Sequence, residues 1–333
     1  MILGQRIQTL MNVRFFDWRD LPILHRYRHR GLFLDAATML TRGQFLVPAG
    51  AMLAYFAPAI GIFTFLCENG DHSESPLLGQ VTHPPGSPSA RLSFLAPESA
   101  LESFELPALL DYAALQIGER GAFHIQAEVD EQHGALEPLR NAGFAIYARQ
   151  RIWQLEEPPS LEVEPLACRL CKDQDVPAVR SLYNDLVPGL VQQVEPPPRS
   201  GSRSLVYYQD GMLLAYLELR YGPFGIWVQP FVHPDAENSV NQLVLRLQNL
   251  PNRHSRPVYV CVRSYQSWLE PFIDEIGAKS SSSQALMVRH LAISRLAAQV
   301  FALPAINGKH PEPTAPMMRL ENYYNEHDRK KNY

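Results

Sequence analysis

The sequence has few cysteines, almost no net charge and no known hydrolase or nucleotide motif, and each absence excludes a class of protein. Four cysteines in 333 residues do not make a disulfide framework, which favours a reducing, cytoplasmic compartment. The 30 basic and 34 acidic residues give a net charge of −4 without a basic stripe, so no nucleic-acid partner is expected. No G-x-S-x-G, H-E-x-x-H or P-loop lysine motif occurs. Cys168 and Cys171 have no second pair and no histidine at zinc spacing, so no metal site is predicted.

Long hydrophobic runs are also scarce, and one uncharged run needs an explanation. Residues 45–67 carry no charge over a length that could span a bilayer. Because the run contains two prolines and two glycines and ends in strand-forming residues 62–66, we predict a buried turn or short helix followed by a core strand. The alternative interpretation of this run is a membrane-spanning segment. Residues 1–12 lack a signal-peptide pattern, and no membrane partner is expected.

What the sequence does contain is a phrase that occurs twice. Residues 129–144 and 262–278 each place a valine seven residues before Leu-Glu-Pro and a glycine a short distance after it. The two tripeptides begin at Leu136 and Leu269, so they lie 133 residues apart. Solenoid and propeller repeats are only about 20–50 residues long, so this offset suggests two copies of a whole domain. A chain of 333 residues is long enough for two domains.

The expected elements follow the same order in both halves. We predict a strand and a helix, then meandering strands, a helix, a strand, a short helix and a last strand. A linker at 156–165, rich in proline and acidic residues, separates the halves, and the residues after 292 form an irregular tail. We therefore predict domains at 1–157 and 158–292 with a tail at 293–333. The elements are expected at 13–28, 62–68, 77–83, 90–97, 106–121, 122–129, 134–143 and 144–155, and at 167–171, 175–187, 204–222, 225–232, 239–250, 257–262, 267–277 and 284–291.

This order resembles the GNAT superfamily of acyl-CoA-dependent N-acyltransferases, and it does so twice. The phrase Asn-Ala-Gly-Phe at 141–144, which runs into the strand after it, resembles the end segment of that family, and residues 274–278 are its weaker counterpart. The resemblance implies an α/β fold with a mixed sheet, made of two tandem GNAT-like lobes. It also implies acyl transfer from acetyl-CoA to an amine.

The family binds the CoA pyrophosphate in a glycine-containing loop between the fourth strand and the next helix, where backbone N–H groups surround the anion. The equivalent stretches here, 96–110 and 232–244, contain no glycine. The first carries three glutamates, Glu98, Glu102 and Glu105, which repel a polyanion. We therefore expect weak or absent acetyl-CoA binding, with the second stretch the better candidate. Its candidate cofactor-binding residues are Val232, Pro234, Asn238 and Ser239.

A candidate general base lies on the strand at 122–129. His124, Gln126 and Glu128 alternate there with apolar residues, so one strand face is polar, and the family opens its acceptor cleft beside this strand. Glu128 is the candidate catalytic residue. The alternative is a strand face near the domain interface, with Glu128 in a structural ion pair with an arginine such as Arg149 or Arg151. The tyrosine with which the family protonates the departing thiol is replaced by Leu139 and Ile273 in the two halves.

Three functions stay open at this point. The first is an N-acetyltransferase that transfers an acetyl group from acetyl-CoA to a small-molecule amine despite its degenerate loops. The second is a tandem GNAT-fold protein without catalysis that binds a small molecule or a protein partner. In the third, the second half is a purely structural mate that completes the first half. The resemblance in element order favours the first, and the missing glycines favour the second and the third.

Overall fold

The computed structural model describes residues 11–27, 29–43, 60–69, 76–155, 166–198, 203–250 and 253–291. All of them lie in one compact unit, residues 1–293. The linker, the tail and residues 45–59 of the uncharged run, for which we predicted a turn or helix, lie outside the described residues. The predicted core strand after that run is present as β3.

The first half of the chain, here called lobe 1, follows the predicted order with two added elements. A short strand and a helix, β2 and α3, follow the first helix and were missed, although Asp35 is a conventional helix N-cap whose carboxylate accepts from Thr38 N–H. The elements of lobe 1 are β1 (Met11–Phe15), η1 (Trp18–Asp20), α2 (Leu21–Tyr27), β2 (Leu32–Phe33), α3 (Ala36–Arg42), β3 (Ile62–Asn69), β4 (Leu77–Thr82), β5 (Ser89–Ala96), η3 (Glu98–Ala100), α5 (Glu105–Gly118), β6 (His124–Asp130), α6 (Leu136–Asn141) and β7 (Ala145–Leu155).

The second half, lobe 2, repeats that order, and the two Leu-Glu-Pro tripeptides fall at equivalent places. Leu136 begins α6, which lies between β6 and β7. Leu269 immediately precedes α10, which lies between β12 and β13. The elements of lobe 2 and the strand after it are β8 (Arg169–Leu170), η4 (Asp173–Asp175), α7 (Val176–Leu186), α8 (Gly189–Gln192), β9 (Leu205–Gln209), β10 (Met212–Tyr221), β11 (Ile226–Val232), η5 (Pro234–Ser239), α9 (Val240–Gln248), β12 (Val258–Arg263), η6 (Ser264–Leu269), α10 (Glu270–Glu275), β13 (Lys279–Ser280) and β14 (Gln284–His290).

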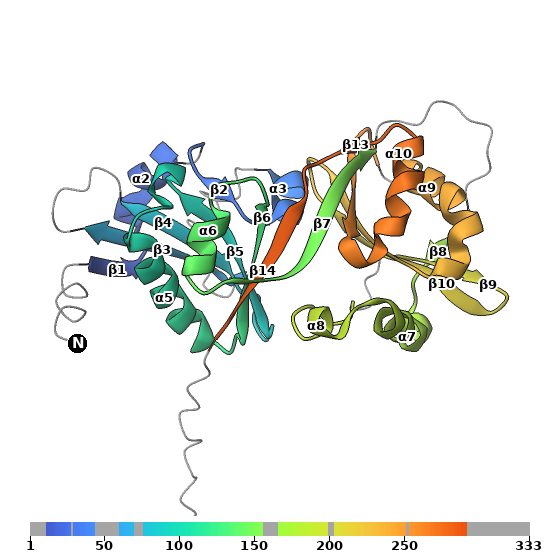
Figure 1. The fold of residues 1–333 in the computed structure, drawn as a ribbon, viewed down its shortest axis with the longest axis horizontal. Helices are drawn as coiled ribbons and strands as arrows, with labels where there is room; N and C mark the ends of the chain where they lie inside the picture. Colours follow the sequence, from blue (N-terminus) through green and yellow to red (C-terminus); the bar gives the residue numbers. More distant parts are fainter. Residues whose placement is uncertain are drawn as a thin grey trace, which may run out of the picture. The chain divides into compact units, whose positions relative to one another are not determined.

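The described strands form a single mixed sheet in which the two lobes exchange their last strands. The order is β1-β3-β4-β5-β6-β14-β7-β12-β11-β10-β9-β8. The C-terminal strand β14 is inserted between β6 and β7, while the far half of β7 pairs with β12 and β13 of lobe 2. Figure 1 shows β14, late in the colour sequence, among the early strands of lobe 1, and β7 running on into lobe 2. The predicted boundary at 157/158 lies in the linker, but the sheet continues across both lobes.

Each lobe has an apolar core on one face of the sheet. In lobe 1, α5 packs on Phe65, Leu92 and their neighbours. In lobe 2, α9 and α10 pack on Val228, Val260 and the strands beside them. On the opposite face, α7 covers lobe 2 and the N-terminal part of α3 reaches from lobe 1 onto β11, β12 and β7. The lobes therefore share strands and also cover one another.

Candidate functional site

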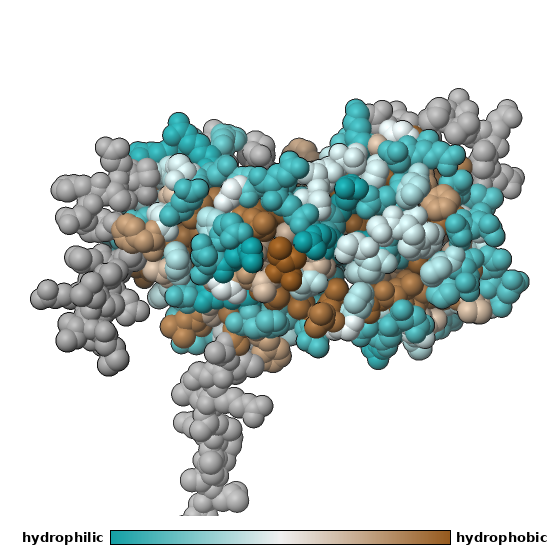
Figure 2. Space-filling model, in the orientation of Figure 1, coloured by the Kyte–Doolittle hydropathy of each residue, from teal (hydrophilic) through white to brown (hydrophobic). Residues whose placement is uncertain are grey.

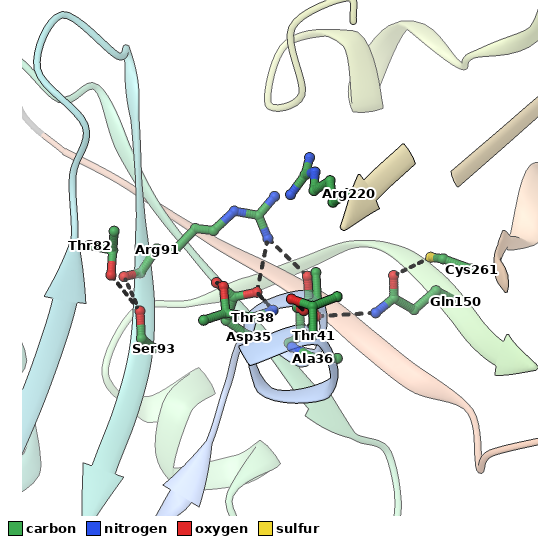
Figure 3. Close-up of polar contacts among 12 residues, drawn as sticks. Asp35, Ala36, Thr38, Thr41, Thr82, Arg91, Ser93, Gln150, Arg220 and Cys261 are labelled. Atoms are coloured by element: carbon green, nitrogen blue, oxygen red, sulfur yellow. Dashed lines mark hydrogen bonds and ion pairs between the residues drawn. The ribbon is translucent and has the colours of Figure 1, made fainter. Parts of the chain in front are cut away.

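Glu128, the predicted base, is a buried carboxylate held by groups of its own chain. Its side chain is 7% exposed. The backbone N–H of Ala36 donates to one oxygen at 2.9 Å, and Arg91 donates to the other at 3.0 Å. Gln150 adds a longer contact of 3.3 Å. Figure 3 shows Arg91 reaching toward Asp35 and the start of α3. The partial exposure expected of an acceptor-facing base is not observed, and the catalytic role of Glu128 stays a prediction.

Glu128 does pair with an arginine, as the alternative prediction had it, but the partner is Arg91 and not Arg149 or Arg151. Arg149 pairs with Glu131 at 2.6 Å, and Arg151 pairs with Glu270. Both arginines lie on β7, which β14 separates from β6, so neither faces the strand of Glu128 directly.

The other two polar residues of the β6 face contact lobe 2. The side-chain N–H groups of His124 and Gln126 both donate to the carbonyl of Val194, each at 2.9 Å. Burial lowers the pKa of His124, so the ring is neutral at neutral pH and Nε2–H is the donor. Val194 lies in the segment after α8, which was predicted only as a loop. The polar face was therefore predicted correctly, but its partners at these two residues are protein groups.

The interval between β5 and β6 is filled by the chain itself. Backbone pairing of these parallel strands ends at Arg91 and Gln126. Beyond that point the N–H of Leu34 donates to Ser93 O at 3.0 Å, and the N–H of Glu128 donates to Leu34 O at 2.9 Å. Leu34 is 1% exposed. An extended ligand cannot pair with these strand edges without displacing a core residue.

The equivalent interval in lobe 2, between β11 and β12, is constructed differently. Backbone pairing of β11 with β12 ends at Val228 and Val260, although β11 continues to Val232. Pro230 has no N–H to give to a neighbouring strand, which fits a position where the ladder ends. Among the described residues, the group that reaches the carbonyl of Val232 is the side-chain amide of Gln266, at 3.1 Å.

The four predicted cofactor residues gather at this end of lobe 2. Val232 ends β11, and Pro234, Asn238 and Ser239 belong to the 3-10 helix η5 that follows. Asn238 and Pro234 are exposed, and the hydroxyl of Ser239 lies 3.4 Å from that of Tyr207. The first turn of η5 also carries two carboxylates, Asp235 and Glu237. These add negative charge where a diphosphate would lie.

A polar cluster that sequence reasoning did not find lies at the end of β12. Arg263, 4% exposed, pairs with Glu195 at 2.8 Å and donates to Gln150 Oε1 at 2.6 Å. Tyr147 donates to the same oxygen of Glu195 at 2.6 Å, and Cys261 donates to Gln150. Figure 3 shows Gln150 directed at Cys261. Glu195 follows α8 in a proline-rich loop, and no local pattern predicts that it meets a strand end 68 residues later.

Three buried polar atoms beside this cluster have no hydrogen-bond partner among the described residues. They are Nε of Arg263, the hydroxyl of Tyr265 and Oε1 of Gln266. All lie within four residues at the carboxyl end of β12, the end at which open α/β sheets bind ligands. Burial raises the pKa of Tyr265 and of Tyr147, so both hydroxyls stay protonated at neutral pH. Unpaired buried polar atoms are costly, so the three atoms make this strand end a candidate binding site.

Comparison with solved structures agrees with this architecture. A GCN5-related N-acetyltransferase from Sphaerobacter thermophilus is 13% identical and covers 84% of this chain and 96% of its own, with a TM-score of 0.53. The protein has the GNAT fold. The match spans both lobes, since neither lobe alone makes up 84% of the chain. No known family profile matches the sequence, and neither does any curated protein.

Two further GNAT structures align over a similar share of the chain. A tandem GNAT protein from the clavulanic acid biosynthesis pathway is 15% identical and covers 85% of this chain and 99% of its own, with a TM-score of 0.46. A GNAT acetyltransferase from Colwellia psychrerythraea is 11% identical, covers 84% of this chain and 99% of its own, and has a TM-score of 0.41.

The other predicted sites and surfaces can be placed on the GNAT fold. No group of three or more His, Cys, Asp or Glu among the described residues could hold a metal ion. The four cysteines are free, and burial raises the pKa of Cys168 to about 11, which opposes a redox role.

None of the described helices combines the length and apolar character needed to cross a membrane. Figure 2 shows apolar patches divided by hydrophilic side chains on the face it presents. Leu139 and Ile273, in the positions of the family tyrosine, are core residues.

Proposed function

We propose that the protein transfers an acyl group from a CoA thioester, with acetyl-CoA as the expected donor, to an amine, and that lobe 2 alone holds the thioester. The observation that carries this proposal is the contrast between the two strand intervals. Residues 32–34 occupy the interval of lobe 1, whereas in lobe 2 the strand end carries unpaired Arg263, Tyr265 and Gln266 atoms. A CoA thioester ends in an extended arm with amide groups, which can pair with a strand edge as an added strand does.

The residues at the end of β12 suit the thioester end of that arm. Nε–H of Arg263 and the O–H of Tyr265 are buried donors without acceptors among the described residues. Attack on a thioester carbonyl places negative charge on its oxygen, and donors already oriented in a buried site stabilise that charge. Gln266 Oε1 is an acceptor for an amide N–H of the arm. In this proposal Glu128 orients Arg91 and the start of α3 and does not act as the base.

The nucleotide end of CoA fits less well. Asp235 and Glu237 lie in the first turn of η5, which contains no glycine, and no lysine or arginine belongs to this element. The loss of two or three charge-assisted amide bonds corresponds to a loss in affinity of about a thousandfold. We therefore expect donor binding to be weak, with Asn238 and Ser239 as the available polar contacts.

A second function is favoured by that same acidic turn. If the thioester does not bind, the protein is a tandem GNAT-fold binding protein whose lobe 2 holds a small molecule or a protein partner at the end of β12. The four free cysteines fit the reducing, cytoplasmic location expected for either function.

The two functions are separated by donor binding and thiol release. In a thermal melt, we expect a small upward shift that needs millimolar acetyl-CoA, and a slow release of free CoA thiol when a primary amine is added. Asn238→Glu should abolish the shift, because it adds a carboxylate beside the phosphates. Glu102→Gln, in the equivalent exposed turn of lobe 1, is the matched control and should change nothing. A strong shift that survives Asn238→Glu contradicts the assignment to lobe 2, and binding without thiol release favours the second function.

A further inference from the structure

We propose that Glu195, oriented by Tyr147 and Arg263, is the acceptor subsite: it binds the ammonium group of the amine and takes its proton. This inference rests on the proposed acyl transfer in lobe 2. It supplies the carboxylate that the side chains of β12 do not provide. Tyr259, Cys261 and Arg263 on β12 include no carboxylate, and the fold brings one from the segment after α8.

The polar cluster around Glu195 carries an unbalanced charge. Three carboxylates, of Asp35, Glu128 and Glu195, interact with two guanidinium groups, of Arg91 and Arg263. Cys261 and Tyr147 are neutral, because burial raises both of their pKa values, that of Cys261 to about 12. Arg220 nearby is paired with Glu218. Among the described residues the cluster therefore carries one excess negative charge, and a bound cation would balance it.

The contacts of Glu195 use only one of its two carboxylate oxygens. One oxygen, Oε1, receives both Tyr147 and Arg263. The other, Oε2, has no hydrogen-bond partner among the residues that the structure describes, and the side chain is 14% exposed. The hydroxyl of Tyr183 donates to the backbone carbonyl of Glu195 and fixes the loop. The carboxylate is thus oriented through one oxygen and available through the other.

Aromatic side chains lie beside Glu195. Tyr147, Tyr183 and Tyr265 all pack on the same apolar cluster beside Glu195, and aromatic rings with a carboxylate are a favourable setting for an ammonium ion. The unpaired donors of Arg263 and Tyr265 lie next to it and suit the thioester oxygen. Tyr147 belongs to β7, the strand that crosses from lobe 1, so the subsite is complete only when the strands are exchanged.

In the proposed acyl transfer, Glu195 and the departing sulfur each take one proton from the acceptor nitrogen. The ammonium of the acceptor gives one proton to Oε2 of Glu195, and the freed lone pair attacks the thioester carbonyl carbon to form the C–N bond. The C–S bond breaks, and the sulfur leaves with its electron pair. The sulfur then takes the second proton from nitrogen, which gives an amide and a free thiol, and Glu195 releases its proton to water.

The test uses the full-length protein, three variants and two readouts. Glu195→Gln keeps the shape of the side chain, and we expect it to raise the KM and the dissociation constant of a primary amine by about tenfold to a hundredfold. Tyr147→Phe removes only the orienting hydroxyl and should lower kcat by about threefold to tenfold while leaving the KM of acetyl-CoA unchanged. Tyr208→Phe is the matched control, because Tyr208 packs on the same apolar cluster but its hydroxyl donates to the carboxylate of Asp175 at 2.9 Å and not to Glu195. It should change neither quantity.

The second readout does not need turnover. Binding of benzylamine and spermidine is measured by calorimetry in wild type and variants, with melts to confirm folding. Amine binding that disappears in Glu195→Gln supports the subsite even if no acyl-CoA is turned over, in which case only the proposed acyl transfer fails. Wild-type protein that binds neither amine, or Glu195→Gln protein that keeps the wild-type amine KM and affinity, overturns the inference.

Discussion

An arginine and an aspartate six residues apart begin each lobe and were not recognised as a pair in the sequence. Arg14 binds Asp20 with two hydrogen bonds of 2.6 and 2.8 Å, and Arg169 binds Asp175 with two of 2.6 Å. In both, the aspartate also accepts the backbone N–H three residues before it, of Asp17 and of Lys172. The pair fixes the turn from the first strand into the first helix. The same contacts at both places extend the likeness of the lobes beyond the Leu-Glu-Pro helices.

Replacing Asp175 by asparagine should destabilise the protein by about 2 kcal/mol, since its buried carboxylate loses the charge that accepts hydrogen bonds from the partly exposed Arg169 and from the backbone. Hydrogen bonds from Arg169 hold the pKa of Asp175 well below its usual range. The stability that this carboxylate contributes is therefore present above its unfolded pKa of about 3.9 and is lost as the pH falls through the folded value. Urea denaturation between pH 7 and pH 3 should show a shallower loss for the variant. Glu218→Gln, in a more exposed pair, is the control and should cost under about 1 kcal/mol.

At the scale of elements, α3 links the two lobes because it contacts both of them. Its Ala36 N–H binds Glu128 in lobe 1, while Ala36 and Ala37 pack beside Trp227 and Cys261 of lobe 2. Its C-terminal end lies against the turn between β10 and β11, where Phe224 N–H donates to Thr41 O at 3.0 Å. The turn contains glycines because the backbone of α3 approaches so closely.

Gly225→Ala should therefore separate α3 from lobe 2. A Cβ there would meet a ring carbon of Tyr259 at 2.7 Å and the carbonyl of Leu40 at 2.8 Å. We expect a loss of about 1–3 kcal/mol in the free energy of unfolding, measured by urea denaturation. Gly189→Ala is the control, because nothing lies within 4 Å of its added Cβ. Equal stability of the two variants would show that the close approach does not constrain the fold.

At the scale of the whole molecule, the exchanged strands make the two lobes one folding unit. β7 pairs with β14 through its first half and with β12 through its second. A chain cut in the linker would leave lobe 1 without β14 and lobe 2 without β7. The polar cluster at the end of β12 draws on both lobes and would be lost with them.

Full-length protein should consequently unfold in one cooperative transition. Tryptophan fluorescence reports mainly on lobe 2 and β7, through Trp153, Trp227 and Trp268, whereas far-ultraviolet circular dichroism reports on both lobes. We expect the two denaturation curves to coincide. Residues 1–157 and 158–333 expressed separately should each be unstable and should associate when mixed. Two separate transitions, or halves that fold alone, would contradict the coupling.

The sequence by itself determined the α/β class, the order of the elements apart from β2, α3 and α8, the likeness of the two halves and the polar face of β6. These features depend on local periodicity, caps and turns, which residues close together in the chain determine. It also directed attention to the turn at Val232 to Ser239. Only the tertiary structure decided which strands lie side by side, that Leu34 fills the interval of lobe 1, and that Glu195 meets Arg263. The pairing of strand edges and of buried carboxylates depends on the free energy of the whole assembled sheet. Because the paired segments are far apart in the chain, local periodicity does not predict which of them pair.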